Sequence, residues 1–195
     1  MKAYEADFWD QRYQNKQTGW DAQQVTTPIK EYIDQVENKS LKILIPGCGN
    51  AHEAEYLLAK GFQNITILDY APTVVEELQK KYKDRKEIKV ICQDFFQHTE
   101  QYDLVLEQTF FCALLPSQRE DYVQQMRKII LPKGRLVGVL FNKDFGNDHP
   151  PYGGSLDEYQ KIFKPYFQIQ TMEKCYNSIP PRRDAEIFIN LQIKS

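Results

Sequence analysis

Strand and helix patterns alternate along the chain from residue 41 onward, and this alternation constrains the fold more than any other feature of the sequence. Apolar and β-branched runs bounded by turn residues predict five strands, and amphipathic runs between them predict helices. Strands that alternate with helices form βαβ units, in which successive strands lie parallel and helices cover the sheet. The predicted strands are Lys42–Ile45, Ile65–Asp69, Lys89–Cys92, Leu104–Glu107 and Arg135–Phe141, and the predicted helices are Ala51–Lys60, Thr73–Tyr82 and Ser117–Ile130.

The last third of the chain follows a different pattern. A helical pattern at Ser155–Phe163 precedes two further strand patterns, Phe167–Cys175 and Ala185–Ile193, which the short segment NSIPPRRD joins. A loop this short cannot contain a crossover, so these two strands are predicted to pair antiparallel. The expected fold class is α/β, a Rossmann-like, mostly parallel seven-stranded sheet with an antiparallel C-terminal hairpin and helices on both faces.

A single domain over residues 1–195 is expected, because one hydrophobic core commonly serves about 100–200 residues. Residues 1–40 precede the sheet and contain Trp9, Tyr13 and Trp20, which are too many rings for a disordered tail. No stretch approaches the ~18 consecutive apolar residues of a membrane span. Met1–Asp10 has three acidic residues, Glu5, Asp7 and Asp10, and no apolar run, unlike a secretory or transit peptide, so the cytoplasm is the expected location.

Charge and cysteine spacing exclude several kinds of partner. The net charge of −2 and the pI of about 6.0 provide no long-range attraction to nucleic acid. The four cysteines lie far apart, with neither a CxxC pair nor a histidine at ligand spacing. We therefore expect reduced, mostly buried thiols and no metal site. No segment of the sequence indicates an obligate protein partner.

The segment KILIPGCGNAHEAEYLL places two glycines between a hydrophobic strand and a helix. Gly47 and Gly49 allow a sharp turn and a close approach to a ligand, although such a turn also occurs for purely structural reasons. A diphosphate-binding turn needs a third glycine where this chain has His52, so the turn suits a nucleoside without phosphates. Asn50 and Glu53 have the spacing of a capping box, which predicts that the helix begins at Asn50.

Acidic residues follow the second and third predicted strands. Asp69 ends the second strand, 20 residues beyond Gly49, where a carboxylate can accept hydrogen bonds from both hydroxyls of a ribose. The same residue also suits the N-cap of the helix that follows. After the third strand, Asp94 can accept the exocyclic amino group of an adenine while Phe95 covers its face. Together with the glycine turn, these residues favour an adenosine site.

These residues and several longer segments resemble the thiopurine S-methyltransferase family and, within it, the halide and thiol methyltransferases. The resemblance runs from about residue 8 to the C-terminus, and TFFCALLP and PGCG are its more specific parts. A parallel core closed by an antiparallel hairpin is also the layout of Rossmann-like methyltransferases, whereas dinucleotide dehydrogenases usually continue with parallel units. The matching segments are GWDAQQVTTP, ILIPGCGNAHEAEYL, YDLVLEQTFFCALLP, GGS after PPY, and NSIPPR.

The resemblance implies S-adenosylmethionine as the cofactor. An aromatic lid from residues 1–40 would cover the sulfonium, which a ring face attracts by about 0.5–2 kcal/mol, although the same rings could simply pack on the core. Gln108 aligns with a cofactor-contacting tyrosine of related members, and Tyr13 stands where relatives often have tryptophan. The implied cofactor-binding residues are Trp9, Tyr13, Trp20, Gly47, Gly49, Asp69, Asp94, Phe95 and Gln108.

The resemblance further implies in-line methyl transfer to a small soft nucleophile: a thiol, a thiopurine, bisulfide or a halide ion. Opposite charges annihilate in such a transfer, so a dry pocket favours it and no strong base is needed. Tyr152 is expected to orient or deprotonate the acceptor, unless it only anchors its loop, and Arg182 to attract an anionic acceptor, unless it lies in a solvated turn. The predicted acceptor pocket consists of Trp20, Phe110, Phe111, Tyr152 and Arg182.

Two alternatives from other functional classes stay open at this point. An NAD(P)-dependent reductase would share the glycine turn and the acidic strand end, but His52 and the terminal hairpin argue against it. A non-catalytic protein with a degenerate methyltransferase fold would bind the nucleoside, or nothing, without turnover.

Overall fold

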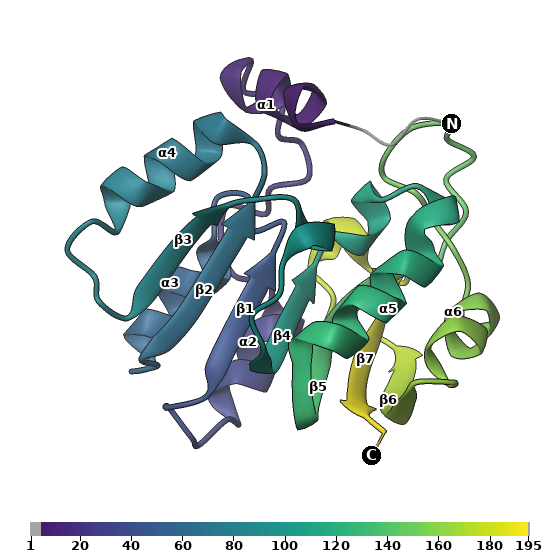
Figure 1. The fold of residues 1–195 in the computed structure, drawn as a ribbon. Coiled ribbons are helices and arrows are strands. Elements are labelled where there is room, and N and C mark those ends of the chain that lie inside the picture. The colour runs from purple at the N-terminus through teal and green to yellow at the C-terminus, as the bar shows by residue number, and fades with distance from the viewer. Residues whose placement is uncertain (1–4, 195) are drawn as a thin grey trace.

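The computed structural model describes residues 5–194 and contains one seven-stranded sheet in the order β3-β2-β1-β4-β5-β7-β6. The predicted fold class is confirmed, since every expected strand is present and helices cover both faces of the sheet (Figure 1). The strands are β1 Lys42–Pro46, β2 Asn64–Asp69, β3 Ile88–Cys92, β4 Tyr102–Gln108, β5 Ile130–Phe141, β6 Phe167–Lys174 and β7 Glu186–Ile193.

Strand direction separates the parallel part of the sheet from its C-terminal edge. The strands β1 to β5 pair parallel with one another, as in the β1–β2 register that aligns Ile45 with Ile67. In contrast, β7 is antiparallel to both β5 and β6, which confirms the predicted hairpin. The carboxyl ends of five parallel strands therefore meet at one edge of the sheet, where open α/β sheets bind their ligands.

The helices divide between two cores on opposite faces of the sheet. Side chains alternate along each strand, so Ile43 and Ile45 of β1 belong to one core and Leu44 to the other. The first core packs against α2, α3 and α4, and the second against α5 and α6, which lie in front of the sheet in Figure 1. The helices are α1 Ala6–Gln14, α2 Thr27–Asp34, α3 His52–Ala59, α4 Pro72–Lys81, α5 Arg119–Ile129 and α6 Leu156–Phe163.

The predicted start of the helix after β1 is wrong. Helix α3 begins at His52, its N-cap is Ala51 in the left-handed region at φ +55°, and no side chain caps it. The Asn50 side chain makes a different bond, since its amide donates to Asp21. A capping box is a local signal, and here its first residue, Asn50, binds a residue far away in the sequence.

The fifth strand begins earlier than predicted. β5 starts at Ile130, directly after α5, and its first residue pairs with Tyr102. The ladder is irregular beyond that pair and resumes where Leu104 aligns with Arg135, which is the predicted start. Pro132 and Gly134 lie between these two paired segments, and such residues weaken strand patterns.

Two further properties concern membranes and side-chain chemistry. Within residues 5–194, no helix is both long and apolar enough to cross a bilayer, and no cluster of three or more His, Cys, Asp or Glu side chains could hold a metal ion. Cys48, Cys112 and Cys175 are buried, in line with the expectation of mostly buried thiols, whereas Cys92 is exposed.

Candidate active site

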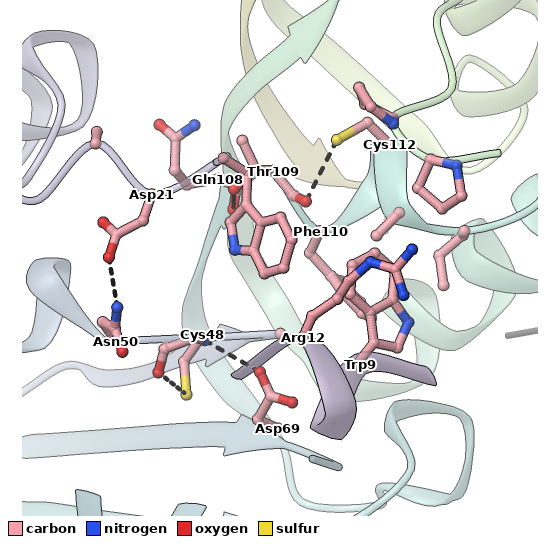
Figure 2. Close-up of a pocket in the computed structure, with 18 of the residues that line it drawn as sticks. Trp9, Arg12, Asp21, Cys48, Asn50, Asp69, Gln108, Thr109, Phe110 and Cys112 are labelled. Carbon is pink, nitrogen blue, oxygen red and sulfur yellow. Dashed lines mark hydrogen bonds between the residues drawn. The ribbon is translucent and has the colours of Figure 1, made fainter. Parts of the chain in front are cut away.

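A pocket of about 620 Å³ lies where the parallel strands end. The segments that directly follow β1, β2, β3 and β4 line it, and residues 8–26 contribute a cover. Figure 2 shows Cys48, Asn50 and Asp69 on one side of the pocket and Phe110 and Cys112 on the other. The sequence-predicted residues that line it are Trp9, Tyr13, Trp20, Gly47, Gly49, Asp69, Asp94, Phe95, Gln108, Phe110 and Arg182.

The turn after β1 is in close contact with its surroundings at both glycines. Gly47 has φ +56° and Gly49 has φ +47°, a region that side chains rarely adopt. A Cβ on Gly47 would lie 2.2 Å from the Phe110 ring, and one on Gly49 would lie 2.9 Å from the Tyr13 hydroxyl oxygen. The backbone of this turn thus approaches a pocket wall and the N-terminal cover with no room for a side chain.

Asp69 ends β2 as a buried carboxylate beside the pocket, with 7% of its surface exposed. Its Oδ2 accepts the Gly49 amide at 3.1 Å, and its Oδ1 accepts the Tyr70 and Ala71 amides at 2.8 and 3.1 Å. Burial raises the pKa of Asp69, and the three backbone donors offset part of that rise. Helix α4 has Ala71 as its N-cap, so Asp69 orders the loop ahead of the helix rather than capping it.

Asp94 and Phe95 form the start of a short 3-10 turn after β3, Phe95–Gln97. The Asp94 carboxylate accepts the Phe96 amide at 2.9 Å, which fixes its position at the pocket. Phe95 is buried, and its ring packs edge-on against Phe110 with the ring centres 5.1 Å apart. The two residues therefore present a carboxylate and the edge of an aromatic cluster to the same pocket.

Aromatic side chains of the N-terminal segment cover the pocket. Trp20 packs edge-on against Trp9 and Tyr13, with ring centres 5.5 and 5.9 Å apart. Burial, followed by the negative charge of Asp69, raises the pKa of Tyr13 well above its ordinary value, so its phenol stays neutral. Helix α1 is tied to the rest of the chain by Asp10, whose carboxylate accepts the Thr73 amide of α4 at 2.7 Å.

A buried glutamate holds the turn that follows β4. Glu107 is fully buried, and its Oε1 accepts the amides of Phe110 and Phe111 at 2.9 and 2.8 Å. Its Oε2 accepts the Tyr122 hydroxyl at 2.6 Å, and burial raises the pKa of Glu107 to about 7. Thr109 within this turn has φ +61°, which is strained for a β-branched residue. The Glu107 bonds thus stabilise an unfavourable backbone that sets the Phe110 wall.

Gln108 lies at the end of β4, where its side chain lines the pocket. Its Oε1 accepts the Thr26 hydroxyl at 2.7 Å. Its Nε2 is buried, and within residues 5–194 this atom has no hydrogen-bond partner. A buried amide donor without a partner is uncommon in proteins, so it marks a position where a ligand oxygen could bind.

Phe111 and Tyr152, predicted to wall the acceptor site, do not line the pocket in this structure. Phe111 is buried in the core, where its ring packs edge-on against Tyr122 and Tyr159. Tyr152 is also buried, its amide donates to the Cys112 carbonyl at 2.7 Å, and its hydroxyl donates to the Asp148 carbonyl at 3.0 Å. These bonds give Tyr152 the anchoring position that the sequence left open as its other role.

Sequence reasoning also missed several residues that line the pocket. Asp21 and Thr26 lie in the GWDAQQVTTP segment, which had drawn attention only for its resemblance to the family. Arg12 and Cys112 carry no sequence signal of their own, and Arg12 reaches the pocket only because α1 lies over it (Figure 2). Glu53, first interpreted as part of a cap, is buried at the pocket, and burial raises its pKa.

Comparison with known protein families gives one match over most of the chain. The family model described as thiopurine S-methyltransferase matches residues 4–190. A probable thiol methyltransferase 2 from Arabidopsis thaliana is 29% identical over 184 residues, covering 91% of this chain and 81% of the relative. A thiopurine S-methyltransferase from Vibrio parahaemolyticus is 25% identical over 180 residues, covering 82% of each chain.

Comparison with solved structures supports the fold. A 1,6-didemethyltoxoflavin-N1-methyltransferase from Burkholderia thailandensis, solved with 1,6-didemethyltoxoflavin and S-adenosylhomocysteine, superimposes with a TM-score of 0.79. The match covers 97% of this chain and 87% of that one at 12% identity. At this identity the likeness extends to the fold, which is that of class I methyltransferases.

Proposed function

Because the chain belongs to the thiopurine S-methyltransferase family, we propose that it transfers the methyl group of S-adenosylmethionine to a small soft nucleophile, namely a thiol, a thiopurine, bisulfide or a halide ion. The names of the relatives, a probable thiol methyltransferase and a thiopurine S-methyltransferase, support this acceptor class. The cofactor is the one whose demethylated product occupies the structural neighbour.

The single observation that most supports the proposal is the position of Asp69. A buried carboxylate at the end of the second parallel strand, beside a pocket of about 620 Å³, suits a ribose with two free hydroxyls. The pocket has the volume of a site for a drug-sized ligand. The raised pKa of Asp69 fits as well, because hydroxyl donors from a ligand would favour its ionised form.

The residues present fit the remaining parts of the cofactor. Asp94 and Phe95 would bind an adenine, and the tight turn at Gly47 and Gly49 would lie against the nucleoside with no Cβ between them. The buried Gln108 Nε2, which has no partner within residues 5–194, would donate to an oxygen of the cofactor. When bound, S-adenosylmethionine supplies an electrophilic methyl group on a positively charged sulfur.

The aromatic cover would act by excluding water. Trp9, Tyr13 and Trp20 form a contiguous set of rings at the pocket, and a ring face attracts a nearby cation. Removal of water from an anionic nucleophile raises its reactivity toward a cationic methyl donor. The neutral Tyr13 phenol adds no charge that would repel an anionic acceptor.

The acceptor end of the pocket would consist of Trp20, Phe110 and Arg182. The Arg182 Nη2 donates to the Trp20 carbonyl at 2.6 Å, and its Nη1 lies 3.6 Å from the Glu186 carboxylate. That Nη1 is buried and has no hydrogen-bond partner within residues 5–194, so it could donate to an anionic acceptor. The nearby Cys112 thiol would not compete as a nucleophile, because burial raises its pKa to about 12.

Tyr152 and Phe111 would stabilise the segments that line the pocket. Tyr152 would anchor the loop of residues 145–154, which contributes Phe145 and Pro151 to the pocket lining. Phe111 would support the turn after β4 from beneath.

The activity is tested by incubating the protein with S-adenosylmethionine and one acceptor at a time, namely iodide, bisulfide or an aromatic thiol. We expect a methylated product, detected by gas or liquid chromatography, with at least one of these acceptors. Replacement of Asp69 by Ala should weaken S-adenosylhomocysteine binding by about 1–3 kcal/mol, while Asp84→Ala, an exposed control, should not change it.

Other outcomes would reject the proposal. Turnover of a catechol or an amine, with none of any soft acceptor, would refute the acceptor class. Binding of NADH in place of S-adenosylhomocysteine would favour a reductase, which the family match does not support. Cofactor binding without turnover of any acceptor would indicate a non-catalytic member.

A further inference from the structure

His52 occupies the position where a diphosphate-binding turn has its third glycine, and the proposed reaction does not use it. Its Nε2 lies 2.7 Å from Asp21 Oδ1. Asp21 belongs to the loop between α1 and α2, 31 positions earlier in the chain, and directly follows Trp20. The bond therefore joins the N-terminal cover to the first turn of α3.

Asp21 receives donors on both of its carboxylate oxygens. Its Oδ2 accepts the Asn50 amide, as Figure 2 shows, and its Oδ1 accepts both His52 and the Gln23 backbone amide, the latter at 2.6 Å. Burial alone would raise the pKa of Asp21, yet the bonds from Gln23, Asn50 and His52 lower it. The carboxylate is thus ionised and held by donors from two separate parts of the chain.

Asn50 does not cap the helix that follows it. An Asn just before a helix ordinarily accepts an amide of the first turn through its side-chain oxygen. Helix α3 instead begins without a side-chain cap, behind Ala51 at φ +55°. A sequence that forgoes a cap and places a non-glycine residue in the left-handed region indicates a functional demand at this turn.

Trp20 is held by a second segment of the chain as well. Its carbonyl accepts Arg182 Nη2 at 2.6 Å, and Arg182 belongs to the segment between β6 and β7. Its ring packs against Trp9 and Tyr13. The loop that contains Trp20 has no helix or strand of its own, and bonds to other segments hold it in place.

We propose that Asp21, Asn50 and His52 form a latch that fixes Trp20 over the pocket, and that they are positioning residues for cofactor binding. The expected effect on cofactor binding rests on the proposed function, whereas the expected effect of Asp21 on the position of Trp20 does not. The latch acts through Trp20 and touches no reacting atom.

The chain offers a direct readout, because its only two tryptophans are Trp9 and Trp20. Tryptophan emission, and its quenching by acrylamide, therefore report on the cover alone. We expect Asp21→Ala to increase the quenching constant about twofold or more without any ligand, as the ring becomes accessible. Asp7→Asn is the matched control, since Asp7 is an exposed carboxylate of α1 outside the pocket lining. It should leave quenching unchanged.

The second measurement is titration calorimetry with S-adenosylhomocysteine. Asp21→Ala should raise the Kd about 5- to 100-fold, because the ligand must then order the loop on binding. Asp21→Asn, which keeps the shape and loses the charge, should have an intermediate effect and guards against a variant that fails to fold. His52→Ala should weaken binding in the wild-type background and add little in the Asp21→Ala background, since the two residues act as one unit.

Three results would overturn the latch. They are unchanged quenching in Asp21→Ala, an unchanged Kd despite increased quenching, and full additivity of Asp21→Ala with His52→Ala. If the wild-type protein binds no S-adenosylhomocysteine, the proposed cofactor is wrong. Quenching then decides alone whether Asp21 fixes Trp20: equal quenching in Asp21→Ala and wild type refutes the latch.

Discussion

Replacement of Gly47 by Ala tests the close approach at the turn after β1. Gly47 has φ +56°, and a Cβ there would lie 2.2 Å from Cδ2 and 2.8 Å from Cγ of Phe110. Ordinary carbon–carbon contacts are about 3.5–4.0 Å, so the ring would have to move by more than about 1 Å. Phe110 has little freedom to do so, because its ring contacts Phe95 and its amide is bound to Glu107.

The expected magnitude has two parts. A non-glycine residue in the left-handed region costs about 1–2 kcal/mol, and overpacking of a tight contact costs about 1–3 kcal/mol. Gly47→Ala should therefore lower the free energy of unfolding by about 2–5 kcal/mol. Gly61→Ala is the matched control, because Gly61 has φ +82° but no atom within 4 Å of an added Cβ. In Gly61→Ala the free energy of unfolding should fall only by the backbone cost, about 1–2 kcal/mol.

Urea unfolding measures the stability of both variants, and titration with S-adenosylhomocysteine measures their binding. We expect Gly47→Ala to raise the Kd about tenfold or more, since the methyl group and the displaced ring both intrude on the pocket, and Gly61→Ala to leave it unchanged. In a Phe110→Ala background the two ring contacts disappear and only the 3.1 Å contact with Cβ of residue 110 stays, so most of the difference in stability between Gly47→Ala and Gly61→Ala should be lost. Equal losses of stability and equal affinities for the two glycine variants in the wild-type background would refute the close-approach argument.

Two further predictions concern buried side chains near the pocket. Burial raises the pKa of Glu107 from 4.5 to about 7. Between these pH values the native state therefore retains a proton that the unfolded chain releases. The free energy of unfolding should fall as the pH rises through this window. In Glu107→Gln the side-chain oxygen can still accept the Phe110 and Phe111 amides, the amide nitrogen can donate to the Tyr122 oxygen, and the charge is lost. The stability advantage of this variant in urea unfolding should grow from near zero at pH 4 to at most about 3 kcal/mol at pH 8; a constant difference would contradict this. Tyr152→Phe should lower stability by about 1 kcal/mol through loss of the bond to Asp148 and change kcat by less than twofold, whereas a large loss of kcat at unchanged stability would restore the catalytic role first predicted for Tyr152.

The strands of the sheet could be predicted from the sequence because the patterns that mark strands and helices are local and repeated. Each parallel strand is a short apolar run, and each crossover is an amphipathic run, so the presence and the parallel direction of the strands follow from rules that hold for nearly all βαβ units. The early start of β5 was missed because a strand that continues directly from a helix has no turn residue to mark its beginning. Residues at strand ends, such as Asp69 and Asp94, could be placed at the pocket for the same topological reason.

Sequence patterns did not predict which way individual side chains near the pocket point. Asn50 has the local signal of a cap, but its amide donates to Asp21, 29 positions earlier in the chain. Tyr152 was expected in the pocket because its loop follows β5, yet its hydroxyl binds a carbonyl of that same loop. Phe111 is adjacent to the pocket wall Phe110, and the turn after β4 directs the two rings to different surroundings. None of these orientations follows from composition or periodicity.

His52 stands where a diphosphate-binding turn has its third glycine, and this position relates the type of ligand to the way the cover is held. A diphosphate has to approach the first turn of the helix closely, which is why a side chain is excluded there in dinucleotide-binding proteins. A nucleoside without phosphates leaves that space free, and in this chain the imidazole occupies it and binds Asp21. If this reasoning is correct, His52→Gly should not create affinity for NADH, because the rest of a diphosphate site is missing, but it should loosen Trp20 as Asp21→Ala does. Tight NADH binding by that variant, with unchanged acrylamide quenching, would mean that His52 serves to reject phosphates rather than to hold the cover.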